Sequence, residues 1–423
     1  MAEGNFLSDD FLRQLTAVGA ADILVGIPTA NNHETIQHVV NAVQIGLVKY
    51  FPRDRAVLIN PDGGSRDDTP ALVKAASVPD FRSVLSASPL RTLHMLSTRY
   101  HPGRGLAGAF RLVFAAADLL RARACAVVSP DVISITPEWI DALVRPVYRE
   151  GFDLVTPLYQ RHKFDALLVK NILSPFIRAA YGYQIEEPAA GEWCVSGKLA
   201  CYLLEQEVWH EDFMRFGSPL WMTATALAED FRLCQSFLGP RIRAAHHPDQ
   251  DLPAMIQQTV GTLFRSLEVH QPFWLSRNGS QSVPAFGFQS LVDLSAVRVN
   301  RKRLLEMFQN GVEELSSILE MILSAATLQE IREVSRDGEA SRHFTDELWV
   351  KTVYEFAASY HRSVMNRDHL LQALTPLYRG RISSYIAENH GASLEGLRRR
   401  LESLQQKYES LKPYLIQGWL GKA

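Results

Sequence analysis

A membrane-spanning segment, a secretion signal and a strong charge imbalance are all missing from this sequence. No run of eighteen apolar residues occurs, so no membrane span is expected. The amino terminus, MAEGNFLSDDFLRQL, has no basic region followed by an apolar run, which predicts a cytoplasmic protein. The net charge of −2 gives no general affinity for nucleic acid or for an acidic membrane surface.

Cysteine is also scarce. The four cysteines have no paired spacing and stand among apolar residues, which predicts reduced core residues rather than disulfides or metal ligands. They are Cys125, Cys194, Cys201 and Cys234.

Proline is absent between Pro284 and Pro376, and apolar residues recur there at helical spacing. We therefore expect two domains, an α/β domain over 1–285 and an all-helical domain over 286–423. Leucines over 394–411 recur at alternating steps of three and four, as in a coiled-coil seam. The seam is short, so packing on helices of the same chain is favoured over a homodimer, which stays open.

Short apolar runs alternate with segments of helical spacing in the first domain, which predicts crossover units and a mainly parallel, Rossmann-like sheet. The expected strands are 22–27, 56–59, 91–96, 124–128 and 153–159.

Asp131 follows the fourth expected strand, and a helix is expected to start after it at Thr136-Pro137. An acid at the carboxyl end of a sheet lies where α/β folds bind ligands, and a hard cation favours such a carboxylate. The alternative is an aspartate that caps a turn after Pro130. His246 is the candidate second metal ligand, although only the fold could bring it near Asp131.

Two glycine-containing loops are candidates for phosphate or nucleotide binding. The segment 62–69 is a permissive turn with three aspartates, which could hold a base or ribose. The segment 103–108 fits G-x-G-x-x-G before a helix, but it follows a polar loop rather than a strand. A nicotinamide-dependent enzyme is therefore a minor alternative, and a loop presenting Arg104 to a phosphate is favoured.

Two further loops carry candidate substrate contacts. One has three potential cations after the fifth expected strand, and these suit an anionic acceptor or a solvated loop equally: Arg161, His162 and Lys163. The other places Glu192 beside Trp193, and a carboxylate next to an aromatic ring is a common way to hold a sugar.

Together these segments resemble nucleotide-sugar glycosyltransferases of the GT-A fold. The matching segments are Ile27-Pro-Thr-Ala-Asn31, Asp62-x-Gly-Ser-x-Asp-Asp-Thr69, Pro102-Gly-Arg-Gly105 and Asp131. Downstream segments resemble the retaining branch that makes glucosylglycerate, mannosylglycerate and glucosyl-3-phosphoglycerate. They are Thr156–Asp165, Glu187–Glu192, Trp221–Leu227 and His246.

The resemblance implies roles for the matching residues. Asp131 and His246 would bind Mg²⁺ or Mn²⁺, and Arg104 would act on the diphosphate. Nucleotide contacts would come from Pro28, Thr29, Ala30, Asp62 and Gly103. Acceptor and sugar contacts would come from Arg161, His162, Lys163, Gly191, Glu192, Trp221 and Thr223, and the residues closest to the chemistry would be Asp131, Arg104 and Glu192.

The implied reaction moves a hexose, with glucose favoured, from a nucleoside diphosphate sugar to D-glycerate or a related small anion, with retention, to make a compatible solute. Ser129 stands where the family's D-x-D motif has its first acid, and Asn32 and the segment 217–220 also lack expected acids. Mannosyl transfer from GDP-mannose and a non-catalytic nucleotide-sugar-binding relative therefore stay open.

Overall fold

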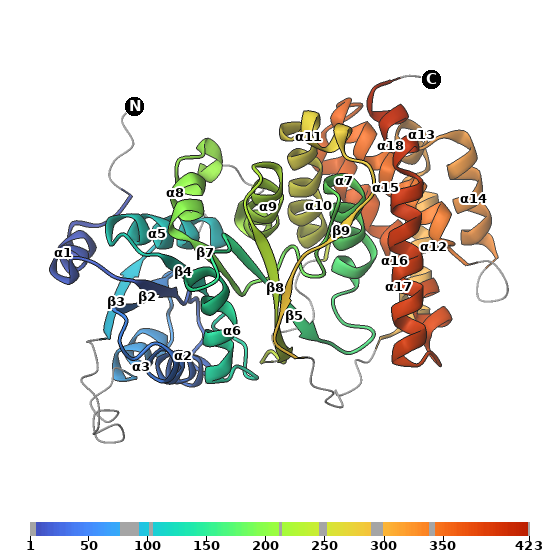
Figure 1. Ribbon diagram of the computed structural model, residues 1–423. Helices are drawn as coiled ribbons and strands as arrows, with labels where there is room; N and C mark the ends of the chain where they lie inside the picture. Colours follow the sequence, from blue (N-terminus) through green and yellow to red (C-terminus); the bar gives the residue numbers. More distant parts are fainter. Residues whose placement is uncertain are drawn as a thin grey trace. The chain divides into compact units, whose positions relative to one another are not determined.

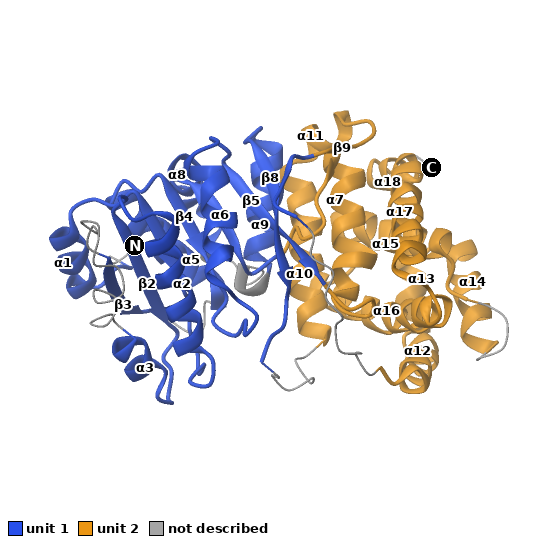
Figure 2. Ribbon diagram, turned by 60° about the horizontal axis from the view of Figure 1, so that its bottom comes forward, with its two compact units in different colours: residues 1–160, 190–248, 283–292 blue, residues 161–189, 249–282, 293–423 orange. Residues whose placement is uncertain are grey.

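The computed structural model describes residues 6–76, 93–100, 105–210, 214–244, 252–288, 299–337 and 343–421. These residues form two compact units (Figure 2). Unit 1 consists of residues 1–160, 190–248 and 283–292, and unit 2 of residues 161–189, 249–282 and 293–423. Two segments that precede residue 285 thus belong to the helical unit 2.

Unit 1 is built on an eight-stranded sheet with the order β10-β8-β5-β7-β4-β1-β2-β3. Only β7 runs antiparallel to its neighbours, β4 and β5. The strands are β1 (Ile23–Gly26), β2 (Ala56–Asp62), β3 (His94–Arg99), β4 (Ala124–Val127), β5 (Leu154–Gln160), β7 (Trp193–Ser196), β8 (Leu233–Pro240) and β10 (Ala285–Phe286). The expected mainly parallel α/β sheet is confirmed, whereas β7, β8 and β10 were not predicted.

Helices cover both faces of this sheet, with α2 and α6 on one side and α5 and α8 on the other (Figure 1). The central strands β1 and β4 are buried along their whole length, which explains why their sequences are continuously apolar. The unit 1 helices are α1 (Asp9–Val18), α2 (Ile36–Tyr50), α3 (Thr69–Ala75), α5 (Gly105–Leu119), α6 (Pro137–Tyr148), α8 (Gly197–Leu204) and α9 (Met214–Ala228), with a 3₁₀ turn, η3 (Glu207–His210).

Helices α2 and α6 approach closely at Gly46, where a Cβ atom would lie 2.6 Å from the Pro137 carbonyl oxygen and 2.7 Å from Ile140. Helix α6 begins as expected, with Thr136 at the N-cap and Pro137 in the first turn. The loop that carries Asp131 is thereby held between β4 and a fixed helix start.

Unit 2 is almost entirely helical. Its elements are η2 (Val169–Leu173), α7 (Ser174–Tyr181), α10 (Leu252–Val269), α11 (Gln271–Ser276), α12 (Arg301–Glu314), α13 (Ser316–Ile322), α14 (Ala325–Arg336), α15 (Asp346–His361), α16 (Arg367–Asn389), α17 (Leu394–Ser410) and α18 (Lys412–Trp419), with a small parallel pair of β6 (Tyr183–Gln184) and β9 (Gln281–Ser282). Within the described ranges, no helix has the length and apolar character needed to cross a membrane.

The leucine seam of α17 packs inside unit 2. Leu397, Leu404 and Tyr408 are buried, and α17 lies against α7 and α15. The expectation that the seam packs on helices of its own chain is therefore confirmed.

The π-helical segment η2 is held by donors from distant helices. The carbonyl of Asn171 accepts hydrogen bonds from the Trp349 indole and the Tyr408 hydroxyl, each 2.8 Å long. The same asparagine accepts a bond from the buried Arg381 through its side chain, at 3.2 Å. Side chains thus replace the regular helical partners that a π-bulge gives up.

The cysteines are free thiols, as expected. Cys125, Cys194 and Cys234 are buried in the sheet, and burial raises the pKa of each thiol. They are core residues rather than nucleophiles.

Candidate functional site

The carboxyl edge of the sheet gathers most of the polar residues in unit 1 that the sequence singled out. The chain steps from β1 to β2 and β3 on one side and then returns to β4 on the other side of β1. This reversal makes a topological switch point at β1 and β4, where open α/β sheets bind their ligands. Thr29 follows β1, Asp62 ends β2, and Asp131 follows β4. Because β7 is antiparallel, Glu192 at its start reaches the same edge.

Asp62 organises the loop that follows it. Its Oδ1 accepts hydrogen bonds from the Thr29 hydroxyl at 3.0 Å and the Ser65 hydroxyl at 2.6 Å. Its Oδ2 accepts bonds from the backbone amides of Gly64 and Ser65 at 3.0 and 2.9 Å. The carboxylate is thus occupied by its own loop, so its direct use on a nucleobase stays a prediction. Pro28 and Thr29 are buried beside it, and Ala30 is exposed.

A second set of bonds ties the loop after β1 to the loop after β2. Asn31, which has a positive φ of 57°, donates its backbone amide to Ser65 at 2.9 Å. His33 lies 2.9 Å from Asp67 through its ring nitrogen. Burial raises the pKa of Asp67, but hydrogen bonds from Thr69 and His33 outweigh it and lower the pKa to about 2. The acids of the 62–69 turn therefore pre-organise two loops at the switch point.

Glu192 is completely buried and holds Arg241 through both of its carboxylate oxygens. The two bonds from the guanidinium are 3.0 and 3.1 Å long, and the Tyr159 hydroxyl also donates to Glu192. Burial alone would raise the pKa of Glu192, but Arg241, with hydrogen bonds from Ser129 and Tyr159, lowers it to about 2. A permanently ionised carboxylate with these partners is suited to positioning Arg241. Its predicted contact with a sugar stays a prediction.

Ser129 contacts Glu192, which explains why this position carries no acid. Its hydroxyl is a hydrogen-bond partner of Glu192. A Cβ added at Gly191 would lie 2.5 Å from the same hydroxyl. An aspartate at residue 129 would bring a second carboxylate against a buried one and crowd Gly191. At this point of the edge, Glu192, the residue before β7, supplies the negative charge instead.

Asp131 is 4% exposed and forms an ion pair with Arg243, whose Nε lies 2.7 Å from Oδ2. Two backbone hydrogen bonds hold the segment after β4 against the segment after β8. The Ile133 amide donates to the Ile242 carbonyl, and the Ala244 amide donates to the Asp131 carbonyl, each at 3.0 Å. The Asp131 Oδ1 atom is buried and has no hydrogen-bond partner within the described part of the chain.

This unpartnered oxygen decides whether Asp131 could hold a divalent cation. Mg²⁺ and Mn²⁺ favour carboxylate oxygens, and among the buried side-chain atoms that have no partner within the described residues, Asp131 Oδ1 is the only carboxylate oxygen. A cluster of three or more histidine, cysteine or acidic side chains suitable for a metal does not occur among the residues that the structure describes. Asp131 therefore fits a cation as one ligand of an incomplete set.

Three predicted site residues lie outside the described residues: Gly103, Arg104 and His246. Their roles stay predictions. Ala244, the last described residue before His246, is hydrogen-bonded to Asp131.

The cationic segment Arg161, His162 and Lys163 belongs to unit 2, where two of its side chains have protein partners. Arg161 pairs with Glu187 at 2.5 Å and with Asp165 at 3.0 Å. Lys163 donates to the carbonyls of Asn389, the last residue of α16, and of His390, which follows it. Burial, and then Lys163, lowers the pKa of His162. These contacts order the segment. Its predicted contact with an acceptor stays a prediction.

Trp221 and Thr223 lie within α9 and are buried. The Trp221 ring packs edge-on against Trp209, with centroids 5.4 Å apart, and the Thr223 hydroxyl donates to the Pro219 carbonyl at 3.1 Å. Both side chains are occupied by packing within unit 1, so their predicted substrate contacts remain untested.

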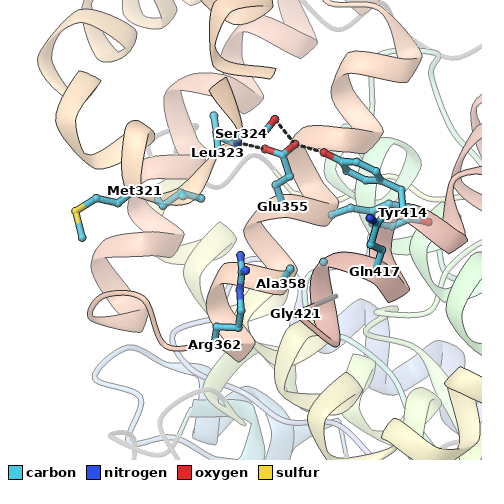
Figure 3. Close-up of a pocket in the computed structure, with 12 residues that line it drawn as sticks. Met321, Leu323, Ser324, Glu355, Ala358, Arg362, Tyr414, Gln417 and Gly421 are labelled. Atoms are coloured by element: carbon cyan, nitrogen blue, oxygen red, sulfur yellow. Dashed lines mark hydrogen bonds between the residues drawn. The ribbon is translucent and has the colours of Figure 1, made fainter. Parts of the chain in front are cut away.

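Unit 2 has a cavity of about 390 Å³ beside α15 and α18 (Figure 3). Glu355 lies in its wall and accepts hydrogen bonds from Ser324, Thr327 and Tyr414. None of the residues predicted from the sequence as site residues lines this cavity.

Sequence reasoning missed Tyr159, Arg241 and Arg243. One signal was available for the two arginines: they come directly after Gly239-Pro240, a residue pair that often marks the end of a regular element. Their pairing with Glu192 and Asp131 depends on contacts distant in sequence, which no local pattern reveals.

No protein-family model matches this chain, and no curated protein sequence matches it either. Among solved structures, it is similar to glucosyl-3-phosphoglycerate synthase from Mycobacterium tuberculosis in complex with Mn²⁺, UDP and glucosyl-3-phosphoglycerate. The identity is 20%, the TM-score is 0.43, and the match covers 63% of this chain and 86% of that one. The same synthase in complex with Mg²⁺ and UDP matches with 21% identity and a TM-score of 0.42, over 60% and 83% of the two chains. Values this low do not identify an activity.

Proposed function

We propose that this protein is a retaining hexosyltransferase of the GT-A type, which moves a hexose from a nucleoside diphosphate sugar to a hydroxyl of a small anionic acceptor. The observation that carries the proposal is Asp131, a buried strand-end carboxylate at the switch point with one oxygen unpartnered. The motifs at 27–31, 62–69 and 156–165 support it. Glucose is the favoured sugar and glycerate the favoured acceptor, and both rest on the resemblance of those motifs alone.

In this proposal, the two interlocked loops after β1 and β2 bind the nucleoside. Their backbone is ordered by Asp62 and Asp67 before any ligand arrives, which reduces the entropy cost of binding. Asp131 and His246 would hold Mg²⁺ or Mn²⁺, which offsets the charge of the departing diphosphate.

Retention is proposed to proceed by attack on the same face of the sugar. The acceptor oxygen bonds to the anomeric carbon as the bond to the diphosphate breaks, and the acceptor proton passes to the leaving phosphate. A double displacement needs a carboxylate that is free to attack the anomeric carbon. Glu192 does not fit that role, because both of its oxygens hold Arg241.

A panel of UDP- and GDP-sugars with glycerate, 3-phosphoglycerate and Mn²⁺ tests the proposal, with the product detected by mass spectrometry. We expect one donor to give a glycosylated acid, and Asp131→Asn to lower the rate at least about a hundredfold. The matched control is Asp141→Asn, since Asp141 also pairs with an arginine at the surface of unit 1. No transfer or donor hydrolysis with any pair would refute the proposed activity. Donor binding without turnover would favour the non-catalytic alternative.

A further inference from the structure

Two arginines that follow β8 face two carboxylates at the same edge, and they are held differently. Arg241 is 10% exposed, and its guanidinium spans both oxygens of the completely buried Glu192. Arg243 is 46% exposed and contacts only one oxygen of Asp131. The first pair is saturated and closed to solvent, and the second is neither.

The contacts of Arg243 allow its guanidinium to leave Asp131 for another partner. Within the described ranges, Asp131 is the only ion-pair partner of its guanidinium, and Nε and Nη2 both donate to Oδ2. The Asp131 Oδ1 atom stays buried without a donor. A half-exposed ion pair contributes little to stability, so a stronger competitor for the carboxylate can replace the guanidinium.

We infer that Arg243 is an exchangeable counter-ion of the metal site: a divalent cation at Asp131 displaces its guanidinium, which then binds the diphosphate of the nucleotide. This inference rests on the proposed function. The unpartnered Oδ1 of Asp131 would hold the cation, whose positive charge beside Arg243 would repel the guanidinium from Asp131. The released guanidinium matches the geometry of phosphate oxygens and can bind them through two parallel hydrogen bonds.

The backbone keeps the released side chain close to its new partner. The Ala244 amide stays bonded to the Asp131 carbonyl, and the Ile133 amide to the Ile242 carbonyl, on either side of Arg243. The Cα of Arg243 therefore remains next to Asp131 when its guanidinium moves. Arg243 would therefore be close enough to contact a diphosphate that is held by a cation at Asp131.

The substitution Arg243→Gln tests the inference, because it should strengthen the binding of Mn²⁺ and weaken the binding of UDP. Titration of Mn²⁺ alone, followed by the electron paramagnetic resonance signal of the free ion, should show binding about fivefold tighter than in the wild type, because the competing cation is gone. Calorimetric titration of UDP at saturating Mn²⁺ should show binding at least about tenfold weaker, because a charge-assisted contact is lost. Arg243→Lys should recover part of the UDP affinity.

Arg145→Gln is the matched control, since Arg145 is also about half exposed and also pairs with an aspartate of unit 1. It should change neither affinity. Unchanged or weaker Mn²⁺ binding by Arg243→Gln, or unchanged UDP binding, would overturn the inference. Both affinities are measured without sugar transfer, so the two proposals fail separately. Opposite effects in a protein that transfers no sugar would uphold the counter-ion and reject the transferase, whereas a wild type that binds neither Mn²⁺ nor UDP would reject both.

Discussion

Replacing Glu192 with glutamine removes the charge of a buried pair while keeping its shape. Glu192 is 0% exposed, and its side chain receives two hydrogen bonds from Arg241 and one from Tyr159. Breaking a buried pair by removing one partner costs about 3–5 kcal/mol, because the remaining charge is left without compensation. The pKa of Glu192 is lowered from 4.5 to about 2, which corresponds to a similar free energy, about 3 kcal/mol. We expect Glu192→Gln to lower the free energy of unfolding by about 3 kcal/mol at neutral pH.

The pH dependence gives this prediction a second signature. Because the pKa of Glu192 is lower in the folded state, its contribution is complete above about 4.5 and is lost as the pH falls toward about 2. Urea unfolding of both proteins at several pH values should therefore show a gap that narrows below about pH 4.5. Glu138→Gln is the control, because Glu138 pairs with Lys49 on an exposed surface and should cost less than about 1 kcal/mol. A Glu192→Gln protein as stable as the wild type, or a stability difference independent of pH, would show that the charge of Glu192 does not stabilise the fold.

Substitutions at three further positions test other parts of the structure by urea unfolding. Ser129→Asp should destabilise the protein by about 1–3 kcal/mol, since it places a second carboxylate beside Glu192, and Ser129→Ala should cost less. Tyr408→Phe should cost about 1 kcal/mol, since it removes one of two donors to the Asn171 carbonyl; a neutral effect would contradict that account of η2. Burial lowers the pKa of His270 from 6.5 to about 4. As the pH falls from about 6.5 to about 4, His270→Asn should therefore lose less stability than the wild type. Equal losses would show that burial does not lower the pKa of His270.

The parallel strands were predictable because each is a short, continuously apolar run followed by a polar loop. β1 and β4 are buried along their whole length, so nearly every position must be apolar. β8 was missed because Gln235 and Ser236 interrupt its apolar pattern, although both lie buried in the sheet. β7 is only four residues long, and Trp193 at its start was interpreted as part of a sugar-binding loop.

The candidate site was predictable only as far as single strand ends. The position of Asp131 at the carboxyl end of its strand follows from local pattern, and so does the turn that begins at Asp62. The partners of these acids do not follow, because Arg243 lies 112 residues from Asp131 in the sequence. Likewise, the reason that Ser129 carries no acid becomes visible only when Glu192 is placed beside it.

We propose that Asp131 binds a divalent cation together with a nucleoside diphosphate, and a thermal-shift experiment with Asp131→Asn measures whether it does. A ligand at a hundred times its dissociation constant stabilises the folded state by about 2.7 kcal/mol, which raises the melting temperature by several degrees. We predict that UDP or GDP with Mn²⁺ raises the melting temperature of the wild type and of Asp141→Asn by this amount. The nucleotide without Mn²⁺ should have a much smaller effect, and Asp131→Asn should show no such rise. An Asp131→Asn protein that shows the full Mn²⁺-dependent shift would mean that Asp131 is not a ligand of the cation.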